Sequence, residues 1–423
     1  MTKSKITASS QLLLAILSLV CGIFMLCAPE HFLSLLTFIL CISFSLLCTY
    51  ELALIFLQKA HRASHIFWLI IYGLVTALLF INPAFFIAFL PYLLGILAIV
   101  NGIVRLLTNY QYRQDHVSGR YWHLFFGIIF LLVGISFIIK PLVHALTSTR
   151  LIGIYLILIS TNLCADFCIQ VLPRNRGYMH RRHRIVLPVL IAAFIPQRIL
   201  SMIQKYSKHG EIPFQSASSP SPDLEVFIHL CEGGLSGFGH VDLCFEGKIY
   251  SYGCYDGHSD RLFQMMSDGT LAVAPREPYI QHCLNYEKKV LVGFGISLTE
   301  ENKQAVRQKI NAMMQNAYRW HCDLELDPQH TGSDSASALY RATGVKFYKF
   351  YSGPFKTYFV LNTNCVLLAD SIIGASGIDL LALSGITTPG TYFLFLNDAY
   401  QLPGSLVVSR ELYGRGDFKN LLN

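Results

Sequence analysis

The chain has 423 residues, of which 53% are hydrophobic, and its mean hydropathy of +0.45 is too high for an ordinary soluble protein. Part of the chain is therefore expected to lie in a lipid bilayer. The net charge of +7 does not indicate a nucleic-acid partner, because no stripe of basic residues interleaved with aromatic ones occurs in the less apolar C-terminal half.

Six apolar stretches occur before Arg174, each close to the roughly 17 to 25 residues that a helix needs to cross a bilayer. They lie near Gln11 to Ala28, Phe32 to Leu57, Ile66 to Ile81, Ala84 to Leu107, Tyr121 to Ile139 and Leu151 to Leu172. The first is not interpreted as a cleavable signal peptide, because an equally apolar stretch follows it closely and no small-residue cleavage site precedes that stretch. Residues 1–173 are thus predicted to form an all-α transmembrane bundle of six helices.

The basic residues that flank these stretches fall mostly on one side of the membrane if six helices alternate. That side carries Lys3, Lys5, Lys59, Arg62, Arg105, Arg113, Arg120, Arg174, Arg176, Arg181, Arg182 and Arg184, against Lys140 and Arg150 on the other. Because lysine and arginine are retained on the cytoplasmic side during insertion, both termini are predicted to be cytoplasmic.

A short turn that carries a proline recurs at similar intervals, at Pro29, Pro83 and Pro141. Seven positions before each proline lies a small residue, which lets neighbouring helices approach closely. These small residues are Gly22, Thr76 and Gly134. The pattern predicts three repeated helical hairpins in one bundle.

The region from about Ser10 to Leu172 resembles the HdeD family of bacterial inner-membrane proteins, which are short six-span bundles of repeated hairpins associated with acid resistance. The resemblance implies a multi-pass protein of the bacterial inner (plasma) membrane. Glu51, Asn101 and Asp166 occupy comparable places in the second helix of each hairpin. They either sit at the headgroups and bond between helices, or form a proton or small-ion relay.

Residues 174–222 are interpreted as a basic interfacial segment followed by a linker. Ile185 to Leu200 is short and interrupted by prolines, which favours a helix lying on the anionic membrane surface. If it crossed the membrane instead, the C-terminal domain would lie on the opposite side. The stretch from Gln215 to Pro222 has the composition of a flexible linker.

Residues 223–423 alternate strand and helix patterns and are predicted to form a cytoplasmic α+β domain. Strands are expected at Asp223 to Leu230, His240 to Phe245, Lys248 to Tyr252, Lys289 to Ser297 and Thr357 to Leu361, with Glu246-Gly247 as a hairpin turn. One helix is capped by Thr299 and expected to run to about Trp320, and another opens at Asn364-Cys365.

The 12 cysteines do not indicate a disulfide framework, because none forms a CxxC pair and a cytoplasmic domain keeps its thiols reduced. Five of those in the C-terminal half are interpreted as core residues: Cys231, Cys244, Cys254, Cys283 and Cys322. His229 with Cys231, or His321 with Cys322, has no second ligand pair at zinc spacing, so no metal or cofactor is predicted.

His240 and Cys365 are the strongest candidates for catalysis. His240 begins a strand after a glycine-rich loop, which lacks the GK[ST] ending of a phosphate-binding loop. Cys365 lies in the first turn of a helix, where unpaired backbone amides and the helix dipole favour a thiolate. If the fold brings the imidazole to the thiol, the pair has the nucleophile and the general base needed for acyl transfer.

The segments from Gly239 to Gly253 and around Asn364-Cys365 resemble the permuted branch of the NlpC-type papain-like superfamily, in which the histidine precedes the cysteine. That branch includes the lecithin:retinol acyltransferase-like enzymes and the YiiX-like hydrolases. A third polar residue normally orients the histidine. Pairing across the hairpin places Ser251 opposite Asp242 and on the His240 face, so Ser251 is the candidate for this third residue. Tyr252 or Asp256 are the alternatives.

These features predict a membrane-anchored cysteine hydrolase or acyltransferase that acts on an amide, ester or thioester bond of a lipid or peptide. The alternative is a non-enzymatic stress, acid-resistance or scaffold protein whose papain-like domain only binds a ligand. Thiol reactivity at Cys365 separates the two hypotheses.

Overall fold

The computed structural model describes residues 2–57, 62–171, 221–230, 239–262, 265–361, 363–376, 388–401 and 405–414. The chain divides into two compact units. The first comprises Met1–Asn109 and Tyr121–Val171, and the second comprises Tyr110–Arg120 and Leu172–Asn423. The predicted interfacial segment, including Ile185 to Leu200, lies outside the described residues.

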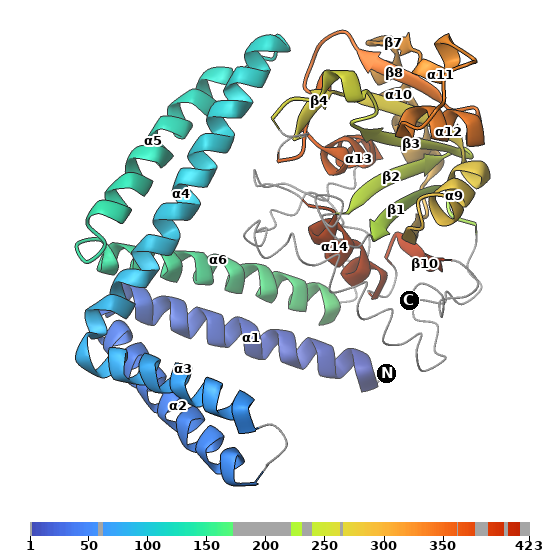
Figure 1. Ribbon diagram of the computed structural model, residues 1–423. Coiled ribbons are helices and arrows are strands. Elements are labelled where there is room, and N and C mark those ends of the chain that lie inside the picture. Colours follow the sequence, from blue (N-terminus) through green and yellow to red (C-terminus); the bar gives the residue numbers. More distant parts are fainter. Residues whose placement is uncertain are drawn as a thin grey trace. The chain divides into compact units, whose positions relative to one another are not determined.

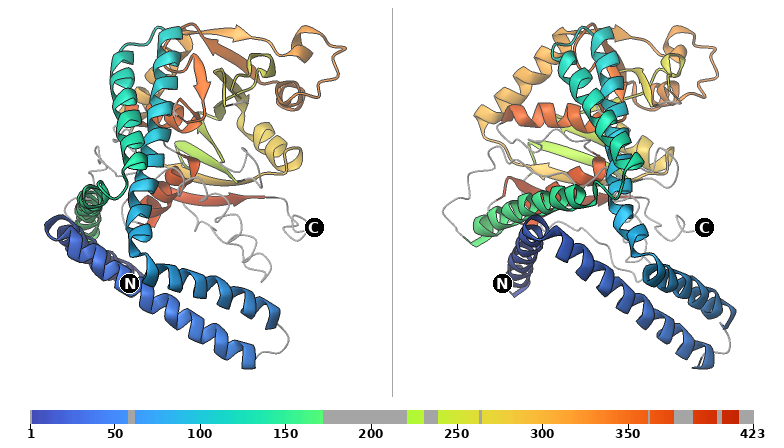
Figure 2. Two further views of the ribbon diagram at one scale, coloured as in Figure 1. Left: turned by 60° about the vertical axis from the view of Figure 1, so that its left-hand side comes forward. Right: turned by 90° about the vertical axis from the view of Figure 1, so that its left-hand side faces the viewer.

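The described residues of the N-terminal region form six helices (Figures 1 and 2). They are α1 (Thr2–Cys27), α2 (Pro29–Leu57), α3 (Arg62–Ile81), α4 (Pro83–Gln114), α5 (Arg120–Ile139) and α6 (Ala145–Val171). Among the described residues, five helices are long and apolar enough to cross a membrane, and the apolar helix Leu12–Cys27 is shorter. The protein is therefore a multi-pass membrane protein.

Prolines open two of these helices. Pro29 begins α2 and Pro83 begins α4, in the helix position where a missing backbone N–H costs nothing. The most extensive packing, however, joins α1 with α6 and α2 with α3, while α4 and α5 lie side by side and approach each other at Gly95 and Gly134, as Figures 1 and 2 show. The expectation that each proline-joined pair forms one packed hairpin is therefore wrong for this arrangement.

Glycines permit two of these helix contacts. A Cβ added at Gly22 would lie 2.8 Å from the carbonyl oxygen of Gly153, and one added at Gly134 would lie 2.7 Å from that of Gly95. Backbone atoms leave no room for a side chain there, so α1 and α6, and likewise α4 and α5, approach as closely as the small residues predict. Thr76 instead contacts Cys48 of α2, with its hydroxyl 3.8 Å from the sulfur.

The described part of the second unit contains an eight-stranded antiparallel sheet in the order β10-β6-β1-β2-β3-β5-β8-β7, and a two-stranded sheet of β4 and β9 (Figure 1). The strands are β1 (Leu224–Leu230), β2 (His240–Phe245), β3 (Lys248–Gly253), β4 (Met266–Asp268), β5 (Thr270–Pro275), β6 (Val290–Ile296), β7 (Ala317–Trp320), β8 (Lys346–Phe350), β9 (Thr357–Phe359) and β10 (Val407–Tyr413). The predicted α+β class is confirmed for this domain.

Helices cover both faces of the large sheet. They are α9 (Arg276–Asn285), α10 (Glu300–Gln315), α11 (Asp323–Leu326), α12 (Ser335–Thr343), α13 (Cys365–Ile373) and α14 (Pro389–Gln401), with 3₁₀ turns η4 (Gly257–Ser259) and η5 (Gly374–Ser376). One hydrophobic core lies under α10, α13 and α14, and a second lies under α9 and α12. Side chains alternate between the two, so on β1 Ile228 enters the first core while Phe227 enters the second.

The hairpin of β2 and β3 has the predicted turn and register. Glu246 and Gly247 have φ angles of 50° and 72°, which matches the turn type whose twist suits a two-residue hairpin. The register places Asp242 opposite Ser251, as predicted. The helix capped by Thr299 is shorter than predicted, because α10 ends at Gln315 and the residues up to Trp320 form β7 against β8.

The stretch Tyr110–Arg120 belongs to the second unit, although it precedes α5 in the chain. The Gln111 side-chain amide donates hydrogen bonds to the Thr363 hydroxyl (2.8 Å) and to the Thr357 carbonyl oxygen (3.1 Å). The Thr357 hydroxyl donates to Asp115 at 2.9 Å. Gln111 and Asp115 are buried, so this stretch completes the packing around β9 and the loop that leads to Cys365.

Candidate active site

Cys365 is the first residue of α13. Asn364 caps the helix, and its side-chain oxygen accepts a hydrogen bond from the Leu367 amide at 3.1 Å. The backbone amides of the first turn have no helical partner and carry the positive end of the helix dipole. The thiol therefore lies beside donors that stabilise negative charge. Cys365 is 3% exposed, which limits its access to small reagents and narrow substrates.

His240 begins β2, and its side chain is 22% exposed. Its Nε2 atom lies 3.0 Å from the Ser251 hydroxyl and 2.9 Å from one carboxylate oxygen of Asp242. Burial by itself would lower the pKa of the His240 imidazole. Interaction with Cys365, by charge and by a side-chain hydrogen bond, and with Asp242 outweighs burial and holds that pKa well above its ordinary value.

Asp242 is a fully buried carboxylate shared by two histidines. Its Oδ1 atom faces His240, while Oδ2 accepts from His229 Nε2 at 2.5 Å and from the Tyr279 hydroxyl at 2.7 Å. Burial alone would raise the pKa of Asp242. The two imidazoles and their hydrogen bonds instead hold it well below its ordinary value, so the carboxylate is charged.

Ser251 lies on the His240 side of β3, as the register predicts. Its hydroxyl is 2.7 Å from the Tyr255 hydroxyl and 3.2 Å from that of Tyr279, in addition to its contact with His240. Ser251 therefore belongs to the polar network around the imidazole. It is a neutral neighbour, whereas Asp242 supplies the charge that stabilises an imidazolium.

Tyr252 and Asp256, the alternative orienting residues, have other partners. Tyr252 packs in the core under α13, and its hydroxyl donates to the Phe355 carbonyl oxygen at 2.9 Å. Asp256 accepts from the Lys349 ammonium at 2.6 Å and from the His258 amide at 3.1 Å. The geometry favours Asp242 over both as the residue that orients His240.

Asp242 and Tyr358 are the site residues that sequence reasoning missed. Asp242 could have been found, because it stands two positions after His240 and side chains two apart share a strand face. Tyr358 on β9 is the other: burial raises the pKa of its hydroxyl well above the ordinary value, and the neighbouring Cys365 raises it further. No spacing in the sequence links it to Cys365, since β9 is short and pairs only with β4 in the described part of the chain.

The remaining thiols behave as core residues where they are described. Burial raises the pKa of Cys244 to about 12 and that of Cys254 to about 11, and it raises the pKa of Cys283 further. These thiols are therefore protonated at neutral pH. Cys231 and the glycine-rich loop up to Phe238 lie outside the described residues.

In the part of the chain that the structure describes, two groups of side chains lie close enough together to hold a metal ion. His229, Cys283 and Glu287 form one group beside Asp242, and Asp323, His330 and Asp334 form a more exposed one. No spacing in the sequence predicts the first group, because its members come from β1, from α9 and from the residues after α9.

Comparison with known proteins identifies part of the membrane region. Residues 13–79 and 74–139 match a family model described as a short repeat of unknown function, DUF308. The N-terminal region carries DUF308 repeats. This is the HdeD-type repeat, so the resemblance is confirmed for these residues. No curated protein and no solved structure matches the chain, and the papain-like resemblance of the C-terminal domain stays a prediction.

Proposed function

We propose that the protein is a membrane-anchored cysteine hydrolase or acyltransferase of papain-like type, acting on an amide, ester or thioester bond. The observation that carries the proposal is the position of His240 between a thiol and a buried carboxylate. Its imidazole interacts with Cys365, while Asp242 lies 2.9 Å from its Nε2 atom. Nucleophile, base and orienting group are the three parts that such chemistry requires.

The contacts of His240 assign its two ring nitrogens. Because Nε2 hydrogen-bonds with the Ser251 hydroxyl and lies 2.9 Å from the charged Asp242 carboxylate, we assign the ring proton to Nε2. Nδ1 is then the nitrogen that takes the proton of the Cys365 thiol. The resulting imidazolium is stabilised by Asp242, and the thiolate by the amides at the start of α13.

In the proposed reaction the Cys365 sulfur attacks the acyl carbonyl carbon and forms a tetrahedral oxyanion. We assign its stabilisation to first-turn amides of α13 and to the hydroxyl of Tyr358, which lies near Cys365. His240 returns its proton to the leaving amine, alcohol or thiol as the carbon–heteroatom bond breaks. Water or a second acceptor, deprotonated by His240, then releases the acyl group from sulfur.

The substrate class follows from where the domain is held. The same chain contains helices long and apolar enough to cross a bilayer, so the site is tethered to a membrane and a lipid or an acylated peptide is the substrate we propose. The six-span topology, the bacterial inner membrane and the cytoplasmic termini belong to the same proposal, and the basic residues of the connecting segments support them.

A second candidate is a non-enzymatic stress or scaffold protein with an inactive binding domain. The DUF308 repeats favour it, because their HdeD-type resemblance is to proteins associated with acid resistance. It requires no reactive thiol at Cys365.

The test is thiol reactivity in the full-length protein in detergent, measured by mass spectrometry after brief exposure to iodoacetamide. Cys365 is expected to be labelled at least about tenfold faster than Cys254, which is more exposed but held protonated. His240→Ala is expected to abolish this preference. His258→Ala, which removes a histidine whose side chain is 82% exposed, is the control and should keep it. Equal labelling of Cys365 and Cys254 in the wild-type protein would favour the scaffold.

A further inference from the structure

His229 has one ring nitrogen that the fold leaves unused. The side chain is fully buried on β1, and its Nε2 atom donates to Asp242. Its Nδ1 atom is buried and has no hydrogen-bond partner among the described residues. Because Nε2 carries the proton, Nδ1 presents a lone pair. A buried acceptor without a partner destabilises the folded state, so its persistence calls for a ligand.

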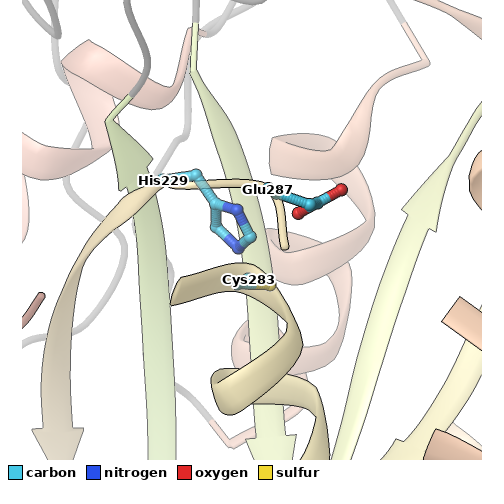
Figure 3. Close-up of side chains that lie close together, drawn as sticks. All are labelled: His229, Cys283 and Glu287. Atoms are coloured by element: carbon cyan, nitrogen blue, oxygen red, sulfur yellow. The ribbon is translucent and has the colours of Figure 1, made fainter. Parts of the chain in front are cut away.

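Two further residues with metal-binding donor atoms lie beside the His229 ring. Cys283 is on α9 and is fully buried, and Glu287 follows the end of α9 with its side chain 28% exposed. One nitrogen, sulfur or oxygen atom from each of the three residues lies within 4.8 Å of the others. Figure 3 shows the His229 ring directed toward Cys283, with the Glu287 carboxylate on the neighbouring segment.

We propose that His229, Cys283 and Glu287 form a zinc site. Imidazole nitrogen, thiolate sulfur and carboxylate oxygen are the donors that zinc takes in proteins, and three of them leave one position for water. Zinc–ligand bonds of about 2.0–2.3 Å place tetrahedral ligands roughly 3.3–3.8 Å apart. The three donor atoms, which lie within 4.8 Å of one another, must therefore move slightly closer together when the ion binds.

The surroundings of the cluster match those of a metal-binding histidine. Zinc-bound imidazoles usually donate their second N–H to a carboxylate, which fixes the tautomer and the ring orientation. Asp242 provides that carboxylate to His229 at 2.5 Å. Nδ1 is the ring nitrogen that this contact leaves available for a metal.

Charge balance also favours a dication. Binding releases the proton of the Cys283 thiol to solvent, giving a thiolate and a carboxylate around one Zn²⁺ ion. The site is then neutral, which keeps the cost of burying the ion small. Without the ion, Lys289 pairs with one oxygen of Glu287 at 2.9 Å. The other carboxylate oxygen remains for the metal.

The site would act through Asp242. Its Oδ2 accepts from His229 and its Oδ1 faces His240, so fixing the His229 ring also fixes the carboxylate beside His240. Zinc here is a positioning group for the polar network and takes no part in bond making. The inference does not depend on Cys365 being reactive.

The test is metal binding by the full-length protein in detergent, after chelation and removal of the chelator. Zn²⁺ is expected to bind at one equivalent that survives buffer exchange, measured by elemental analysis. Co²⁺ is expected to give the near-ultraviolet charge-transfer absorption of a thiolate ligand. Cys283→Ser should abolish that absorption. Cys244→Ser is the matched control, because Cys244 is a buried thiol in the same core but outside the cluster.

A second variant tests the site at a position where a substitution should not unfold the protein. Glu287→Gln changes a partly exposed side chain and is expected to weaken Zn²⁺ binding at least about tenfold while the circular dichroism spectrum is unchanged. Substoichiometric zinc in the wild-type protein, or a cobalt absorption that survives Cys283→Ser, would overturn the proposal. So would equal zinc affinity in Glu287→Gln and the wild-type protein.

Discussion

One carboxylate oxygen of Asp242 lies 2.9 Å from Nε2 of His240, two residues earlier on the same strand. The alternation of side chains along β2 puts both on one face, and the register with β3 adds Ser251 opposite Asp242. The imidazole is therefore held by its own strand and by the next one. The sheet, rather than a loop, therefore sets the direction in which Nδ1 of His240 points.

Removing the Asp242 charge should shift the reactivity of Cys365 with pH. Asp242 helps to hold the pKa of His240 above its ordinary value, so Asp242→Asn lowers that pKa and disfavours the imidazolium–thiolate pair. Alkylation of Cys365 at neutral pH should fall about tenfold for each unit of pKa lost. A pH–rate profile identical to that of the wild-type protein would contradict the role given to Asp242.

Asp242 should also contribute to stability in a defined pH range. Its pKa is lower in the folded state than in the unfolded state, so the folded protein binds fewer protons. The contribution is complete above the unfolded value near 4, and it is lost as pH falls toward the folded value. The difference in melting temperature between the wild-type protein and Asp242→Asn should therefore shrink between pH 5 and pH 3. A difference that stays constant over this range would argue against a charged Asp242.

Two buried tyrosines near the thiol should behave differently. Tyr358 lies near enough to Cys365 for the two groups to interact electrostatically. If its hydroxyl donates to the oxyanion, Tyr358→Phe should lower the turnover of an acyl ester or thioester by about a hundredfold. Tyr252 donates to the Phe355 carbonyl oxygen, so Tyr252→Phe should cost about 1 kcal/mol of unfolding free energy and leave turnover within about twofold. Equal losses of turnover in the two variants would remove Tyr358 from the proposed site.

Lys349 should matter for stability and not for reactivity. Its ammonium is buried and pairs with Asp256 at 2.6 Å and with Asp268 at 3.0 Å. Lys349→Met leaves Asp256 buried without its partner, which should cost roughly 3–5 kcal/mol of unfolding free energy. The preferential labelling of Cys365 should persist wherever the variant is folded. Loss of that preference in folded protein would revive Asp256 as an orienting residue.

In the membrane region, Gly134 is the position where added volume should be least tolerated. A side chain there meets the Gly95 carbonyl oxygen, and overpacking of this kind costs roughly 1–3 kcal/mol. Gly134→Ala should therefore lower the melting temperature of the detergent-solubilised protein. Gly73→Ala is the matched control, since nothing lies within 4 Å of its added Cβ. Similar melting temperatures for the two variants would mean that α4 and α5 do not pack through their glycines.

Local patterns in the sequence predicted the features that depend only on neighbouring residues, namely turns, hairpin register and helix starts. The Asp242–Ser251 pairing follows from a two-residue turn, and the helix start at Cys365 follows from the capping side chain of Asn364. The end of α10 was missed because tertiary pairing of β7 with β8 overrode the helical pattern before Trp320.

Contacts between distant segments could not be predicted in this way. His229 meets Cys283 because α9 packs on the face of β1 that carries odd-numbered side chains. Tyr358 lies near Cys365 in a loop that is closed by hydrogen bonds of Phe359 and Thr363, which no sequence motif marks. The helix pairing in the membrane region likewise depends on which glycines face each other, and the repeat itself does not specify this.

The stretch Tyr110–Arg120 makes the C-terminal domain discontinuous along the gene. Gln111 and Asp115 fill hydrogen-bonding positions at Thr357 and Thr363, two residues before Cys365. A recombinant fragment that starts after the last membrane helix would lack them and would leave the Thr363 and Thr357 positions solvated. During synthesis, these two side chains leave the ribosome well before the strands they join, so the loop before Cys365 closes on a segment that is already in place.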